Sequence, residues 1–139
     1  MGGLTRFGVS MDSDLVEKFD DLIARRGNAT RSEAIRALVR DALIRDTWEH
    51  ADAEVVGTIT LLYDHHVRGV QETLTELQHR NHHAVLSSMH IHLDRHNCLE
   101  VLAVRGKVKD IEHMADRLTA LRGVKHGKLV ATTSGKDLS

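Results

Sequence analysis

The chain has 139 residues, and its 19 Lys and Arg against 20 Asp and Glu give a formal net charge of −1 with neutral histidines. This balance excludes a globally basic protein that coats nucleic acid or an anionic membrane, and no run approaches the ~18 apolar residues of a membrane span. A single cysteine, Cys98, and no recognisable secretory signal predict a cytoplasmic protein. Eleven histidines are a surplus that composition does not explain.

The chain opens with an alternating segment. Residues 4–11 place apolar side chains on one face and polar ones on the other, which predicts a short half-buried strand. The apolar face consists of Phe7, Val9 and Met11. Asp12 is then the expected N-cap of a first helix, and Gly27 is the expected left-handed residue that closes it.

A second helix is predicted from the capping-box pair Thr30 and Glu33 to about residue 46. A strand followed by two helices leaves the strand without a pairing partner in its own unit, and so small a unit buries little apolar surface. Pairing two copies antiparallel about a two-fold axis solves both problems. The sequence therefore predicts an obligate dimer.

The pattern breaks at residues 47–53, which divides the chain into a domain at 1–50 and another at 51–139. Hydrophobic periodicity in the second domain predicts six elements in the order β-α-β-β-α-β. Their ranges are 54–62, 66–80, 84–93, 98–105, 108–121 (closed by Gly123) and 124–132. This order is that of the ferredoxin-like split βαβ arrangement, so the fold class is α+β.

Histidines and the cysteine make the first candidate site. His90 and His92 share one face of the predicted strand 84–93, and Cys98 opens the next strand after a four-residue turn. Two imidazoles and a thiolate suit a divalent first-row metal, and their softness alone allows Zn, Cu, Ni or Co. A fourth nitrogen is expected from the cluster His79, His82 and His83, delivered by a neighbouring chain. The set is unlike a hydrolytic metal site, which keeps a ligand position open for water. Glu100 and Asp94 are near enough in sequence to act as bases, but each suits the orientation of a ligand imidazole at least as well, so an enzyme is disfavoured.

The N-terminal strand makes the second candidate site. In a two-fold dimer its outward face presents Arg6, Gly8 and Ser10 twice on a two-stranded ribbon, which fits the DNA major groove. The start of the second helix, residues 30–32, offers free backbone N–H groups suited to a phosphate. The sequence therefore predicts an interface with double-stranded DNA.

Two segments carry a resemblance to a known family. Residues 25–36 read Arg-Arg-Gly-Asn-Ala-Thr-Arg-Ser-Glu-Ala-Ile-Arg, which resembles ribbon-helix-helix DNA-binding proteins. Residues 89–100 read Met-His-Ile-His-Leu-Asp-Arg-His-Asn-Cys-Leu-Glu, and the chain from about Thr5 to Val130 resembles the nickel-responsive transcriptional regulators (NikR). The resemblance implies a homotetramer in which two ribbon-helix-helix dimers flank four regulatory domains of the ACT type.

The same resemblance implies roles for single residues. The expected ligands of one Ni(II) per chain, in a near-square-planar site, are His90, His92, Cys98 and His79 of a facing subunit. The expected supporting residues around that site are Tyr63, Gln78 and Glu100. The expected DNA contacts are Arg6 and Ser10 to bases, Thr30, Arg31 and Ser32 to phosphates, and Arg68 from a loop. Gly8 stands where a polar base-reading side chain is expected, and Ala37 replaces the second carboxylate of an accessory cation site that Glu33 matches.

These observations predict a nickel-dependent repressor that binds an operator. Two alternatives stay open: a ribbon-helix-helix regulator that responds to Co, Cu or Zn, and one that responds to a small molecule bound by the ACT-like domain.

Overall fold

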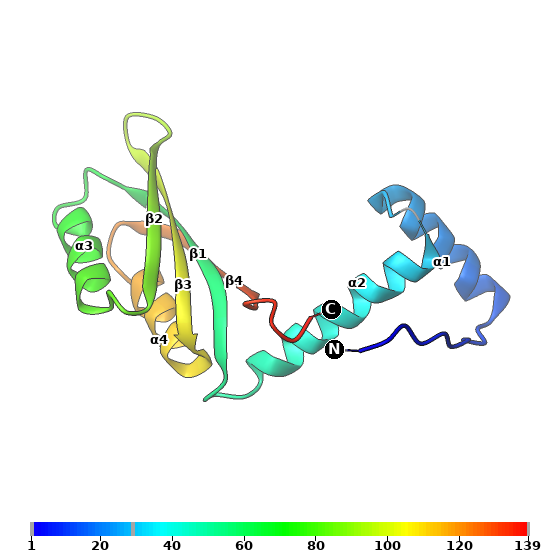
Figure 1. The fold of residues 1–139 in the computed structure, drawn as a ribbon. Helices are drawn as coiled ribbons and strands as arrows, with labels where there is room; N and C mark the ends of the chain where they lie inside the picture. Colours follow the sequence, from blue (N-terminus) through cyan, green and yellow to red (C-terminus); the bar gives the residue numbers. More distant parts are fainter. Residues whose placement is uncertain (1, 29, 139) are drawn as a thin grey trace. The chain divides into compact units, whose positions relative to one another are not determined.

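The computed structural model describes residues 2–28 and 30–138 (Figure 1). The chain divides into two compact units, Met1–Asp41 and Ala42–Ser139. The division falls within the second helix, because the last turns of that helix pack with the second unit. The domain limits 1–50 and 51–139 stay a prediction.

The first unit contains α1 (Ser13–Arg26) and most of α2 (Arg31–Trp48). The predicted ends of α1 are confirmed: the Asp12 carboxylate accepts a hydrogen bond from the backbone N–H of Asp14, and Gly27 adopts a left-handed φ of 74°. At the start of α2 the Thr30 hydroxyl accepts a hydrogen bond of 3.1 Å from the backbone N–H of Glu33, as a capping box requires. The helix runs two residues beyond its predicted end.

The predicted strand at residues 4–11 is not formed within one chain. Residues 2–12 have no regular secondary structure, and their apolar side chains are exposed, at 76% for Phe7, 61% for Val9 and 42% for Met11. The physical reason is that a strand is defined by a backbone ladder, and no other part of the described chain pairs with this segment. An apolar face with an unpaired backbone is what the dimer prediction requires.

The second unit is a four-stranded antiparallel sheet with two helices (Figure 1). Its elements are β1 (Glu54–Asp64), α3 (Val70–Arg80), β2 (Val85–His92), β3 (Asn97–Lys107), α4 (Val108–Thr119) and β4 (Val124–Thr132). The strand order is β2-β3-β1-β4. The predicted β-α-β-β-α-β order is confirmed, and the fold class is α+β.

One hydrophobic core holds this unit together. Alternate residues of β1 and β3 are buried against the apolar faces of α3 and α4. The fully buried side chains include Ile59, Leu102 and Leu118. Trp48 at the end of α2 packs against the same core and donates a hydrogen bond of 2.9 Å to the carbonyl of Thr132. The core therefore holds the sheet in place, and its edge strand β2 carries two of the candidate metal ligands, His90 and His92.

Two predicted helix ends differ from the structure. α3 begins at Val70 and not at residue 66, because Gly69 before it is left-handed, with a φ of 85°. α4 ends at Thr119, where Ala120 caps it, so Gly123 is not its cap. Gly123 has a φ of 97°, and a Cβ there would come within 2.9 Å of Val67, so it allows two loops to approach closely. Among the described helices none is long and apolar enough to cross a membrane.

Candidate metal centre

Three neighbouring strands bring the predicted metal donors to one end of the sheet. In the register of β2 with β3, His92 lies opposite Cys98 and His90 lies opposite Glu100. In the register of β1 with β3, Tyr63 lies opposite Cys98. Side chains two residues apart share a face of a strand, so all of these lie on the sheet face that packs against the core. They form two adjacent rows across the strands: the first contains Tyr63, Cys98 and His92, and the second contains Glu100 and His90.

Cys98 and His92 are the candidate metal ligands of the first row. The Cys98 side chain is fully buried, and its Sγ lies 3.3 Å from Nδ1 of His92. Burial raises the pKa of the Cys98 thiol above its usual value, because the charged thiolate loses its hydration. A cation at this point would offset that cost by stabilising the thiolate.

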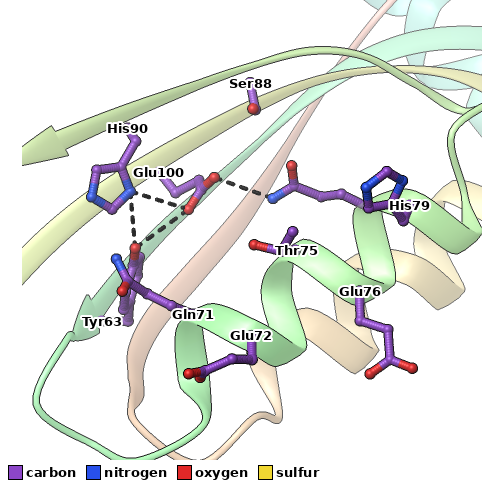
Figure 2. Close-up of a pocket in the computed structure, with 10 residues that line it drawn as sticks. Tyr63, Gln71, Glu72, Thr75, Glu76, His79, Ser88, His90 and Glu100 are labelled. Atoms are coloured by element: carbon purple, nitrogen blue, oxygen red, sulfur yellow. Dashed lines mark hydrogen bonds and ion pairs between the residues drawn. The ribbon is translucent and has the colours of Figure 1, made fainter.

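His90 belongs to a hydrogen-bonded network in the second row (Figure 2). The Tyr63 hydroxyl lies 3.0 Å from Nδ1 of His90 and donates to Oε2 of Glu100 at 3.5 Å. The Gln78 amide donates to Oε1 of Glu100 at 3.1 Å. Glu100 is only 7% exposed, so these partners replace the water that a buried carboxylate needs. Tyr63 and Glu100 therefore contact each other and His90, and Gln78 contacts Glu100.

Tyr63 is kept protonated in this environment. Burial is the largest cause, and together with the nearby Glu100 carboxylate and Cys98 it raises the pKa of Tyr63 to about 12. A phenol with this pKa stays a hydrogen-bond donor over the whole physiological range. It can hold Glu100 and orient the His90 ring, which is how outer partners fix a ligating imidazole.

The structure adds a histidine that the sequence analysis did not single out. The candidate ligand atoms of His65, His92 and Cys98 all lie within 4.8 Å of one another. His65 follows β1, and its backbone N–H donates to the carbonyl of His96 in the β2–β3 turn at 2.9 Å. The predicted ferredoxin-like arrangement contained the signal, because its antiparallel pairing of the first and third strands places the end of β1 beside the start of β3, where Cys98 lies.

His79 lies apart from this group within one chain. It sits on the last turn of α3 and lines the same pocket as His90, at the opposite end of the view in Figure 2. It is not among the described residues whose ligand atoms come within 4.8 Å of one another. The structure of one chain therefore brings His92 and Cys98 together, with His90 beside them, and leaves His79 facing outward from α3.

The donor set fits a divalent first-row metal. The ring centres of His90 and His92 lie 4.9 Å apart. Two imidazoles that bind one ion at an angle between 90° and the tetrahedral angle have centres roughly 4.7 to 5.4 Å apart, since the metal–nitrogen bond is about 2.1 Å and the ring nitrogen lies about 1.2 Å from the ring centre. The neighbouring Cys98 supplies a sulfur donor. The fit rests on these spacings and on donor chemistry.

The expected DNA-contacting residues are exposed in the first unit and in the loop after β1. Arg6, Gly8 and Ser10 lie on the irregular segment before α1, and Arg68 lies between β1 and α3. Arg31 forms a two-pronged ion pair with Asp20, with both N–O distances at 2.8 Å. This pair lowers the pKa of Asp20, chiefly through the hydrogen bond.

Comparison with known proteins matches both parts of the chain. Residues 56–132 match the family model of the NikR C terminal nickel binding domain, and residues 5–46 match that of ribbon-helix-helix proteins of the copG family. Relatives described as putative nickel-responsive regulators include one from Solibacter usitatus, 55% identical over 99% of both chains. Others come from Geobacter sulfurreducens, 56% identical over 99% of both chains, and Nitratidesulfovibrio vulgaris, 52% identical over the full length of both.

A solved structure shares the fold of part of this chain. The uncharacterized protein TM1266 from Thermotoga maritima aligns with a TM-score of 0.52 at 15% identity, over 58% of this chain and 99% of that one. The matched domains are those of transcriptional regulators and not of an enzyme. The chain belongs to the family of nickel-responsive regulators, in which a ribbon-helix-helix domain precedes the NikR nickel-binding domain.

Proposed function

We propose that this protein is a nickel-dependent repressor of nickel-uptake genes, which acts in the cytoplasm and binds its operator when Ni(II) occupies a site of three histidines and one cysteine. The observation that carries the proposal is the pairing of His92 with Cys98 across β2 and β3, beside His90 and its Tyr63–Glu100 network. Nickel supplies a borderline-soft cation that binds imidazole and thiolate together. One ion per chain is the expected stoichiometry.

The fourth ligand in this proposal is His79 of a facing subunit. Within one chain His79 is exposed at the end of α3, and the open edge of the sheet at β2 leaves His90 and His92 accessible to another copy. A site completed by two chains would make metal binding depend on their arrangement. This arrangement supports a homotetramer built as a dimer of dimers.

The proposed DNA interface is the ribbon formed by residues 4–11 of two copies. Arg6, Gly8 and Ser10 would face the major groove, while Thr30, Arg31 and Ser32 would contact phosphate at the start of α2. The exposed apolar side chains of the segment support its pairing in a dimer. Arg31 would exchange its ion pair with Asp20 for a phosphate, and the cost is small because both groups are exposed. Arg68 would add a contact to the DNA backbone.

Regulation would follow from thermodynamic linkage between the nickel site and the DNA interface. A bound ion can shift the DNA-binding equilibrium only by its differential affinity for the two arrangements of the chains. A metal that binds tightly without recruiting His79 from the facing chain would then change DNA affinity little. The affinity of the protein for a metal and the effect of that metal on DNA binding are therefore separate properties.

The test is a pair of titrations on the purified full-length protein. Ni(II) added without oxygen should produce a thiolate-to-nickel absorption band that saturates at one ion per chain, and operator affinity should rise with it. Cys98→Ala should abolish both responses and keep the fold, whereas the exposed His113→Ala should change neither. An unchanged nickel-induced rise in DNA affinity in Cys98→Ala would refute the site.

The DNA contacts have their own test. Arg6→Ala should weaken binding by about 1–3 kcal/mol and relax sequence preference, if Arg6 reads a base. Arg31→Ala should weaken binding to all sequences alike and reduce the salt dependence by about one phosphate contact. Equal losses on operator and random DNA for both variants would remove Arg6 from base recognition.

One observation favours a different metal as a second candidate. His65, His92 and Cys98 are three donors from one chain with ligand atoms within 4.8 Å, a set that suits a four-coordinate ion such as Zn(II) with one further ligand. Tight Zn(II) binding that is lost in His65→Ala, together with zinc-induced DNA binding, would support this alternative. Zinc binding without a DNA response would leave nickel as the effector.

A further inference from the structure

A cavity outside the candidate metal centre lies between α3 and α4, the two helices that cover one face of the sheet (Figure 1). Its volume is about 250 Å³, close to the lower end of the range for small-molecule pockets in proteins. None of the residues proposed for the nickel site or for the DNA interface lines it. We call it the α3–α4 cavity.

The floor of the α3–α4 cavity is apolar. Leu77 of α3 and Met114 of α4 line it, and both side chains belong to the buried core. Ala84, which follows α3, also lines it and is half-buried. An inorganic ion would leave this surface in contact with water, whereas a hydrocarbon chain would cover it. The floor therefore favours an organic ligand.

The rim of the cavity is basic. α3 contributes Arg80, and α4 contributes His113 and, one turn later, Arg117. His83, just beyond the end of α3, also lines the cavity, and all four residues are exposed. A guanidinium is a planar fork of donors that matches a carboxylate, and each imidazole can donate a further hydrogen bond. One arginine on each helix favours a ligand with two acidic groups.

Both arginines are available to a ligand. Arg80 donates to Oε1 of Glu76 at 2.6 Å, but the two side chains are 65% and 60% exposed, so the exchange of this ion pair for another anion costs little. The Arg117 guanidinium has no ion pair or hydrogen bond in the part of the chain that the structure describes. A bound anion would therefore replace one exposed ion pair and water.

The balance of charge favours an anion over a metal ion. Among the described residues that line the cavity, Asp110 is the one carboxylate, and it stands against two guanidinium groups. Its charge also interacts with the ammonium of Lys109, which does not line the cavity. The two guanidinium groups repel a divalent cation from the imidazoles beside them.

We propose that the α3–α4 cavity is a binding site for a short-chain dicarboxylate. One carboxylate pairs with Arg117 on α4 and the other with Arg80 at the end of α3, while the carbon chain lies against Leu77 and Met114. Binding is non-covalent and leaves both partners chemically unchanged. The site goes beyond the proposed nickel function and does not depend on it.

The first experiment compares ligands on the metal-free full-length protein by calorimetric titration at low ionic strength. The probes are succinate and glutarate, with butyrate as the control that has one carboxylate and inorganic phosphate as the control that has no carbon chain. At least one dicarboxylate should bind at one molecule per chain, about tenfold more tightly than either control, which is the effect of one additional hydrogen-bonded charge pair.

Three results of these titrations would overturn the proposal. Butyrate that binds as tightly as the dicarboxylates would remove the second acidic group. Phosphate that binds as tightly would remove the role of the apolar floor and with it the organic ligand. A lack of saturable binding by both dicarboxylates would remove the site.

The second experiment locates the site with variants. Arg80→Gln and Arg117→Gln should each weaken dicarboxylate binding about tenfold. The matched control is Lys128→Gln, which removes one positive charge from an exposed position of β4 outside the cavity and should leave binding unchanged. Equal losses in all three variants would show a general effect of net charge and would overturn the site.

An NMR titration of the wild-type protein gives an independent location. The ring-proton signals of His83 and His113 should shift as the dicarboxylate is added, while those of His50 and His126, which are exposed outside the cavity, stay in place. Equal shifts of all four histidines would contradict the placement. Because no nickel is present in any of these measurements, their results hold whether or not the proposed nickel centre is correct.

Discussion

Tyr63→Phe removes one oxygen atom from the network behind the candidate metal centre. That hydroxyl lies 3.0 Å from Nδ1 of His90 and 3.5 Å from Oε2 of Glu100, and the ring around it is fully buried. Phenylalanine keeps the packing, so the change isolates the two hydrogen bonds. It leaves the buried Glu100 carboxylate with one fewer donor.

Two magnitudes follow from this geometry. The free energy of unfolding of the metal-free protein should fall by about 1–3 kcal/mol, the usual effect of a lost hydrogen bond to a buried charged group. Nickel affinity should fall by about 10–100-fold, since outer partners that orient a ligating imidazole have effects of this size. A structural role alone would produce the first change without the second.

The assays are urea unfolding of the metal-free protein and nickel competition against a chelator. Thr75→Val is the matched control, because Thr75 lines the same pocket on the exposed side of α3 without a hydrogen bond to His90 in the described structure. If Tyr63→Phe loses stability but keeps its nickel affinity within about twofold, Tyr63 does not position His90, and the reasoning from the network is wrong.

Three further predictions concern the frame around the site. Trp48→Phe should keep most of the packing and lose the hydrogen bond to the Thr132 carbonyl, which lowers the unfolding free energy in urea by about 1 kcal/mol. Gly57→Ala should destabilise the protein by about 1–3 kcal/mol in the same assay, because its Cβ would come within 2.8 Å of the backbone oxygen of Val130; an unchanged stability would show that β4 can shift. Asp94 has a pKa of about 2 in the folded protein, below its ordinary 3.8. Its contribution to the free energy of unfolding is therefore present above pH 3.8 and is lost as the pH falls toward 2. The stability difference between wild type and Asp94→Ala should shrink over that interval, and a difference that persists at pH 2 would contradict the assignment.

Local sequence signals predicted the secondary structure well. The caps at Asp12, Gly27 and Thr30 act through the next few residues, so they could be identified without knowing the fold. Apolar periodicity located all six elements of the second unit for the same reason, since each period reports one buried face. Where the limits differ, as at the start of α3, a glycine conformation decided the boundary.

The strand at residues 4–11 shows the limit of such signals. Its alternation is a property of the sequence, but its backbone ladder needs a second strand, and within one chain the segment stays irregular. Apolar alternation can therefore indicate which face of a segment will be buried. It does not determine whether a single chain supplies the partner that buries this face.

The candidate metal centre was likewise only partly predictable from the sequence. The sequence by itself determined that His90 and His92 share a strand face and that Cys98 follows a tight turn, because those relations depend only on strand geometry and spacing. Tertiary structure alone decided that Tyr63 reaches His90 and that His65 and His66 come beside the turn that holds His96. These contacts depend on strand register and on two loops meeting at one end of the sheet, and no local pattern in the chain encodes either.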